Sequence, residues 1–336
     1  MKVLFGHSID NIQELCPPYQ NYQILPEDSL ILTGIFAEHK NFDTTLSELD
    51  RLIKHISTDA KYIFLDASAD PVFFTNHELQ ALVELLNKYY QNKICKLLVG
   101  NCQYYLEQTA EIFWYPYWLL CKQHDHAPIK RNKRIGCLNR KNSPHRLWLM
   151  HNLLSKQLVD HDRDIYSVAF KNIYSGQSGC INSWMPNLDP QIQNQISNYP
   201  AQIATIDDGF INDHSLAHPA WATALAVVTE TQVGEYSMIT EKTCKAIASK
   251  SCWISYTGKA SLDVLNALGF SSNTFDNHAT EFDIDPIIQV CQEFDTESRA
   301  LDYYYSKLSI INHNHDWFRS NSWTTVYQHK LQSWLE

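Results

Sequence analysis

Short apolar runs alternate with longer amphipathic stretches along the first part of the chain. The helical pattern is clearest over residues 76–90, where four leucines recur at helical spacing and share one face. Apolar runs separated by helices are typical of strands in a parallel sheet, which are buried on both faces. The predicted strands of this part are residues 3–6, 29–34, 62–66, 96–100 and 112–115.

A second series of the same kind follows a break near residue 130, where the sequence becomes rich in His, Pro, Lys and Arg. Its predicted strands are residues 134–138, 164–169, 224–228, 252–256 and 273–275. Its predicted helices are residues 144–157, 241–250, 261–268 and 285–308, with a last amphipathic stretch at 317–335. We therefore expect an N-terminal Rossmann-like domain (1–128) and a C-terminal one (129–336), with the last helix packing back on the first.

Length and charge favour a two-domain protein and disfavour one that binds nucleic acid or an anionic membrane over a broad surface. A chain of 336 residues is long for one hydrophobic core, which favours two domains. The formal net charge of −10 disfavours broad contact with nucleic-acid phosphates or an anionic membrane. The one obvious basic run, residues 130–134, is interpreted as a solvated linker.

Cysteine usage and the N-terminus indicate where such a protein works. The 9 cysteines are odd in number and show no CxxC spacing, which is typical of reduced, buried thiols. The first residues lack the apolar length of a signal peptide, and no later segment approaches a membrane span. We expect a cytoplasmic protein that does not insert into membranes.

Other motifs do not indicate a metal or a bound cofactor. The Asp-x-Asp pairs at 162–164 and 283–285 do not follow a strand of an N-terminal nucleotide domain, so we interpret them as surface acids. The paired histidines at 124/126 and 313/315 lack further ligands at metal-site spacing. No glycine-rich dinucleotide or P-loop motif occurs, which argues against oxidoreductases and NTPases.

Residues 238–250 carry the strongest functional signal. Thr240 is a good helix N-cap, and Glu241 and Lys242 fall in the first turn. A helix N-terminus offers free N–H groups and a partial positive charge, both of which suit a phosphate. Lys242 can meet the phosphates while Glu241 accepts hydrogen bonds from sugar hydroxyls, so the segment predicts a nucleotide-sugar site.

Two further segments can converge on the same ligand. Arg146 lies in the first turn of the predicted helix 144–157, where its fork of donors suits a diphosphate. Glu230 follows the predicted strand 224–228, at the sheet edge where ligands bind. The structural alternatives are an exposed helix arginine and a solvated strand-end acid.

Together these residues resemble the donor-binding signature of the α-1,3-fucosyltransferases. Residues 227–242, reading VVTETQVGEYSMITEK, have that family's acid after a strand, its loop with aromatics and its Thr-Glu-Lys at a helix start. Arg146, in SPHR, matches an arginine at the start of the first helix of the family's C-terminal domain. The resemblance covers about residues 134–275. It implies a GT-B fold: two facing Rossmann-like domains with mainly parallel sheets and an inter-domain cleft.

The resemblance also implies a reaction. It is an inverting, metal-independent transfer of a sugar, first of all fucose from GDP-fucose, to a glycan acceptor hydroxyl, with no cofactor besides this donor substrate. By carry-over, Arg146 and Lys242 would neutralise the diphosphate and stabilise the charge of the leaving group. Glu241 would bind the ribose or the sugar, Glu230 would stand near the donor, and Thr240 would belong to the same donor site.

The sequence departs from the family at two places. The residue after the acid is Thr231 instead of asparagine. The family's general base follows a glycine at a strand end, and the equivalent here is Asn101, whose amide cannot be that base. Asp66, at the end of the predicted strand 62–66, is the first substitute, and a turn hydrogen bond is its structural alternative. Weaker candidates for the base are Asp70, Glu38 and His7.

Two other functions keep the same donor site. One is a glycosyltransferase that acts on a modified base in nucleic acid, which would need a basic wall on the N-terminal side. The other is a non-catalytic protein that binds a nucleotide sugar or a carbohydrate, which the asparagine at position 101 permits.

Overall fold

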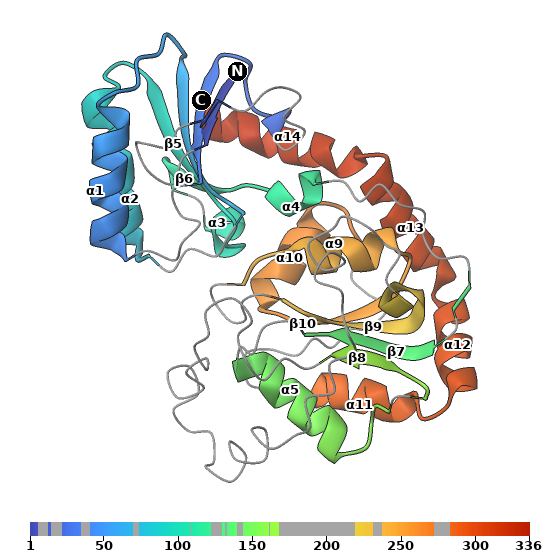
Figure 1. Cartoon of the computed structure of the whole chain (residues 1–336). Coiled ribbons are helices and arrows are strands. Elements are labelled where there is room, and N and C mark those ends of the chain that lie inside the picture. Colours follow the sequence, from blue (N-terminus) through green and yellow to red (C-terminus); the bar gives the residue numbers. More distant parts are fainter. Residues whose placement is uncertain are drawn as a thin grey trace.

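The computed structural model describes residues 1–5, 13–14, 22–34, 41–69, 74–107, 109–121, 130–131, 133–139, 144–160, 162–167, 219–230, 237–271 and 283–336. Within these ranges the chain forms two separate sheets, each covered by helices (Figure 1). Several sequence features lie outside the described residues. They are the weaker candidate bases Glu38, Asp70 and His7, the predicted strand 273–275, and Thr231.

The first sheet contains six strands in the order β2-β1-β3-β4-β5-β6. Its strands are β1 (Lys2–Phe5), β2 (Gln13–Glu14), β3 (Ser29–Thr33), β4 (Tyr62–Ala67), β5 (Ile94–Val99) and β6 (Ile112–Trp114). All neighbouring pairs are parallel except β1 and β2 at the edge. The apolar runs of the sequence therefore form a mainly parallel sheet, as their burial on both faces predicts.

The helices of this first half are α1 (Phe42–Ile53), α2 (Asn76–Tyr89), α3 (Gln103–Leu106) and α4 (Tyr117–Leu120). A capping box starts α2, because the Thr75 side chain accepts from the Glu78 backbone while the Glu78 carboxylate accepts from the Thr75 backbone. Leu79, Leu82 and Leu86 form part of the buried face of α2. The helix predicted from leucine spacing is confirmed.

The second sheet contains four parallel strands in the order β10-β9-β7-β8. They are β7 (Lys133–Leu138), β8 (Ile165–Ser167), β9 (Thr223–Thr229) and β10 (Cys252–Tyr256). The accompanying helices are α5 (Pro144–Ser155), η3 (Pro219–Ala222), α9 (Glu241–Ala248) and α10 (Lys259–Ala267). Because β8 lies on one side of β7 and β9 on the other, the strand order reverses at β7. The carboxyl ends of the strands at such a point are where open α/β sheets bind ligands.

Four helices complete the chain, where the sequence predicted two long ones. They are α11 (Asp285–Glu293), α12 (Glu297–Ser306), α13 (Leu308–Arg319) and α14 (Ser322–Leu335). The single helix predicted over 285–308 is wrong, because Thr296 caps a new helix by accepting from the Arg299 backbone N–H. The stretch 317–335 is also broken, since Asn321 adopts a left-handed conformation with φ 57° between α13 and α14.

The last helix, α14, packs on the first sheet, whose strands lie far from it in the sequence (Figure 1). The Tyr327 hydroxyl donates to the Trp114 carbonyl of β6 at 2.8 Å. Trp334 stacks on Phe113 with the ring centroids 4.8 Å apart. α14 thus covers residues that lie some two hundred positions earlier in the chain.

The basic run at the start of β7 is not a solvated linker. Arg131 is buried and donates to the carbonyls of Trp221, Ser249 and Lys250, at the end of α9. A cation at a helix C-terminus is stabilised by the exposed carbonyls and the helix dipole. Arg131 therefore fixes α9 to the strand region and is not part of a basic surface patch.

Arg134, the last residue of that run, forms a buried ion pair. Its Nε and Nη2 atoms donate to the two carboxylate oxygens of Asp164 at 3.0 and 2.6 Å. Both side chains are almost fully buried, exposed by 2% and 0%. The interpretation of residues 162–164 as surface acids is thus wrong for Asp164, while Asp162, Asp283 and Asp285 are exposed as predicted.

The described cysteines are all buried free thiols, in agreement with the sequence. These are Cys95, Cys102, Cys121, Cys137, Cys244, Cys252 and Cys291. Among the described helices none has both the length and the apolar character needed to cross a lipid bilayer.

Candidate functional site

The first sheet meets residues 237–238, just before α9, at the end of β5. Asn101 and Met238 form an isolated antiparallel bridge, and the Cys102 N–H donates to the Ser237 carbonyl at 2.9 Å. Asn101 is buried at this junction. Asn101, which the resemblance aligns with the family's base, is thus joined by backbone pairing to the residues just before α9.

Gly100 makes this junction possible by close packing. A Cβ atom placed on Gly100 would lie 2.6 Å from the Ser68 carbonyl oxygen and 2.9 Å from the Met238 Cε atom. The first contact is with backbone, which cannot move aside cheaply.

We expect Gly100→Ala to lower the free energy of unfolding by about 1–3 kcal/mol, as overpacking of a tight interior does. Chemical denaturation measures the change. Adding Met238→Ala removes one of the two clashes and should restore part of the loss. A Gly100→Ala protein as stable as the wild type would show that the end of β5 tolerates separation from residues 237–238.

Glu230, at the carboxyl end of β9, is fully buried and fixes the start of α9. One carboxylate oxygen accepts from the Thr240 backbone N–H at 3.1 Å and from the Thr243 hydroxyl, and the other accepts from the Thr240 hydroxyl. The alternative of a solvated strand-end acid is therefore wrong. A buried carboxylate with three donors is a rigid support for the helix N-terminus. Its contact with a donor stays a prediction.

The Glu230 carbonyl joins α5 to the same point. It accepts from His145 Nε2 at 3.0 Å and from Arg146 Nη2 at 3.1 Å. Since a carbonyl only accepts, His145 carries its proton on Nε2. Burial and the Arg146 charge lower the pKa of His145 to about 3, so this imidazole is neutral.

Arg146 is buried, so the alternative of an exposed helix arginine is also wrong. Its Nε has no hydrogen-bond partner in the described structure. Burial lowers the pKa of Arg146, while the charges of Glu241 and Glu230 act in the opposite sense. The guanidinium is therefore held at the site, close enough to Glu241 for the two charges to interact.

Glu241 and Lys242 form an ion pair at the start of α9. The Lys242 Nζ atom lies 3.0 Å from a Glu241 carboxylate oxygen and 3.3 Å from the Thr240 hydroxyl. The two side chains are 22% and 20% exposed, so both are accessible to a ligand, unlike Glu230. Burial raises the pKa of Glu241, but the Lys242 charge and hydrogen bond, its own backbone N–H and Arg146 outweigh this and bring it to about 2.

The helix start is therefore already capped from within the protein. Thr240 accepts from the Lys242 N–H at 3.4 Å, and the Thr240 N–H donates to Glu230. The N-cap predicted at Thr240 is confirmed. The Lys242 N–H, one of the N–H groups that suggested a phosphate site in the sequence, is thus paired with Thr240 in this structure.

Asp66, at the end of β4, is buried and accepts four hydrogen bonds. One oxygen accepts from the backbone N–H and hydroxyl of Ser68, and the other from the hydroxyls of Tyr22 at 2.6 Å and Thr33 at 3.1 Å. Burial and the Asp66 charge together raise the pKa of Tyr22. The Ser68 bond is the turn interaction that the sequence offered as the alternative, and a role of Asp66 as a base stays a prediction.

His145 was missed by the sequence analysis, although it directly precedes Arg146 in the first turn of α5. Tyr22 and Thr33 were missed as well, because nothing in their sequence neighbourhood indicates that they bind an acid more than thirty residues away. In the described part of the chain, no three His, Cys, Asp or Glu side chains gather as they would around a metal ion.

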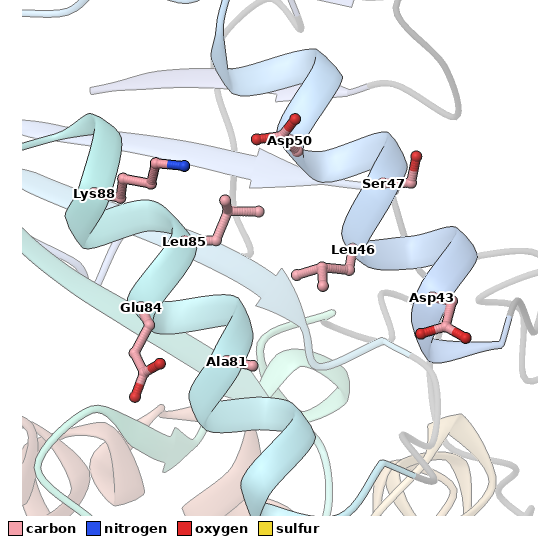
Figure 2. Close-up of a pocket in the computed structure, with 8 residues that line it drawn as sticks. All are labelled: Asp43, Leu46, Ser47, Asp50, Ala81, Glu84, Leu85 and Lys88. Carbon is pink, nitrogen blue, oxygen red and sulfur yellow. The ribbon is translucent and has the colours of Figure 1, made fainter.

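A surface groove lies elsewhere on the molecule, between α1 and α2. Figure 2 shows Leu46 and Leu85 between the two helices, with the acidic Asp43, Asp50 and Glu84 and the cationic Lys88 also lining the groove. Its volume is about 490 Å³. In Figure 1 both helices lie on the outer side of the first sheet, away from α9, so the groove is separate from the candidate donor site.

Comparison with protein-family models finds no match, and comparison with curated proteins finds none either. Comparison with solved structures finds TarM of S. aureus, a GT-B glycosyltransferase, in a crystal structure of a point mutant in complex with fondaparinux, α-GlcNAc-glycerol and UDP. The identity is 12% and the TM-score 0.50 over 93% of this chain and 57% of the TarM chain. The chain thus spans little more than half of the TarM chain, and at this identity the likeness concerns the fold alone. Together with the two mainly parallel sheets, it shows that this α/β chain has the GT-B fold, with two Rossmann-like domains.

Proposed function

We propose that this protein is a glycosyltransferase that uses a nucleotide sugar as donor and a glycan hydroxyl as acceptor. The observation that carries the proposal is the Glu241–Lys242 ion pair at the start of α9, together with the buried Arg146, which donates to the Glu230 carbonyl at the carboxyl edge of the second sheet. This edge is the ligand-binding edge of such sheets, and two cations there suit a diphosphate.

The chemistry follows from these two cations. When a nucleotide sugar reacts, negative charge builds up on the leaving diphosphate, and fixed positive groups stabilise that charge. In this proposal Lys242 and Arg146 have that role in place of a metal, and transfer with inversion then needs a base on the acceptor side. The resemblance to α-1,3-fucosyltransferases makes GDP-fucose the first donor to test. The TarM complex contains UDP and α-GlcNAc-glycerol, which supports the general classes of a nucleotide donor and a glycan acceptor.

A thermal-shift screen tests the donor site. GDP-fucose should raise the melting temperature, and UDP-, CMP- and dTDP-sugars serve as the panel. Lys242→Ala should abolish the shift, because it removes the most accessible cation of the site. Lys259→Ala is the matched control, since Lys259 is 79% exposed on α10 and pairs with the partly exposed Asp263. No shift with any nucleotide sugar contradicts the proposal.

A second candidate is a non-catalytic nucleotide-sugar-binding protein. It is favoured by Asn101, which cannot act as a base, and by Asp66, whose carboxylate is occupied by four donors. Slow donor hydrolysis without transfer to any acceptor in a panel would support it. The nucleic-acid alternative gains nothing from residues 130–134, because Arg131 and Arg134 are buried.

A further inference from the structure

We propose that the Glu241 carboxylate is a built-in competitor of the donor's diphosphate: without a ligand it occupies the anion position beside Lys242, and it must swing away before the diphosphate binds. This inference rests on the proposed function, because it assigns a regulatory role to a residue of the same site. It differs from the role implied by the family resemblance, in which Glu241 binds a sugar or ribose hydroxyl.

The contacts of Glu241 are those of a bound anion. Its carboxylate lies 3.0 Å from the Lys242 ammonium, it accepts a hydrogen bond from its own N–H at the start of α9, and it interacts with the Arg146 charge. A cation, a helix N-terminus and a guanidinium are the three groups that a phosphate would seek here. The carboxylate therefore satisfies the site with the protein's own charge.

The neighbouring acid shows why Glu241 can move and Glu230 cannot. Glu230 is fully buried and accepts from Thr240 and Thr243. Glu241 is 22% exposed, and its side chain can turn toward solvent without breaking the bonds by which Glu230 and Thr240 hold the helix. One carboxylate thus supports the helix while the other can be exchanged for a ligand.

Arg146 supplies a second, independent observation. Its Nε is buried without a hydrogen-bond partner in the described part of the chain, although an unsatisfied buried donor is costly. The carboxylate of Glu241 leaves this donor unsatisfied while it pairs with Lys242. A diphosphate carries more oxygens and more charge than a carboxylate, so it can serve both cations together.

Removing the competing charge should strengthen anion binding. We expect Glu241→Gln, which keeps the size of the side chain, to bind inorganic pyrophosphate about three- to five-fold more tightly than the wild type, the change expected for releasing a partly exposed ion pair. Glu241→Asp keeps the negative charge, so it should bind pyrophosphate no more than about two-fold more tightly than the wild type does. Pyrophosphate has no ribose or sugar, so the role implied by the family predicts no gain with this probe.

Isothermal titration of the full chain with pyrophosphate and with GDP and UDP tests the inference, with circular dichroism to confirm that each variant is folded. Asp263→Asn is the matched control, because it removes one negative charge at an exposed position of α10 and should leave pyrophosphate affinity unchanged. If the wild type binds the nucleotides but Glu241→Gln binds pyrophosphate equally or more weakly, the inference is wrong and the proposed function stands. If neither protein binds any of the three ligands, both are wrong.

Discussion

Replacing Asp164 by alanine is expected to lower the free energy of unfolding by about 3–5 kcal/mol, the cost of leaving one partner of a buried ion pair alone. Asp164 accepts two hydrogen bonds from Arg134 and one each from the backbone N–H groups of Ile135 and Asp160. Its loss would leave a guanidinium that is 2% exposed without its counter-charge in the second sheet. Urea denaturation followed by circular dichroism measures the effect.

The control for this experiment is the exposed pair of Lys259 and Asp263, with side chains 79% and 35% exposed. Asp263→Ala should cost less than about 1 kcal/mol, since water and salt screen such pairs. Combining Arg134→Met with Asp164→Leu removes both charges and should recover much of the lost stability. A loss for Asp164→Ala as small as that of the control would contradict the burial of this pair.

Replacing Asp66 by asparagine is expected to lower the free energy of unfolding by about 2–4 kcal/mol, because an amide cannot accept all four hydrogen bonds that the carboxylate accepts. At least one donor among Tyr22, Thr33 and Ser68 would then face the NH₂ group. The change in unfolding free energy is again the measurement, made beside the melting temperature with and without a nucleotide sugar.

The same variant separates a supporting acid from a general base. If Asp66 only supports the end of β4, turnover by Asp66→Asn should fall no further than its folded fraction. If it is the base, turnover should fall by about 10²–10⁴ while the donor still binds. Tyr22→Phe is a useful partner variant, since it removes one hydrogen bond and leaves the carboxylate. Tyr22→Phe should lower the free energy of unfolding whichever role Asp66 has. It should leave the turnover per folded molecule unchanged.

The strands could be predicted well because their positions are set by local pattern. β4, β9 and β10 are almost wholly buried, and each corresponds to a mainly apolar run in the sequence. Such runs need no knowledge of partners to be recognised. The N-cap at Thr240 was equally local, since the capping atom and the capped N–H are two residues apart.

The breaks between the last helices could not be predicted in the same way. The amphipathic pattern continues through Thr296 and Asn321, so periodicity alone does not show where one helix ends. Only the capping role of Thr296 and the left-handed conformation of Asn321 divide the stretches. Propensity for these caps is weak compared with a sustained helical pattern.

The main error of the sequence-based predictions was to place charged side chains on the surface that are buried in the structure. Arg131, Arg134 and Asp164 read as surface residues because charged side chains usually are, but their partners lie up to 160 positions away. Glu230 likewise finds Thr240 and Thr243 only once β9 and α9 are side by side. The identities of the site residues came from the sequence, whereas their hydrogen-bond partners required the fold.

The packing of α14 on β6 has a consequence for biosynthesis. Phe113 and Trp114 leave the ribosome long before Tyr327 and Trp334, their partners in the folded protein. During synthesis β6 therefore lacks the contacts of α14 until the whole second sheet has been translated, so its apolar side chains remain exposed on this side. We expect nascent chains that stop before α14 to be kept soluble by chaperones, and native folding of the first domain to be completed only once α14 has been translated.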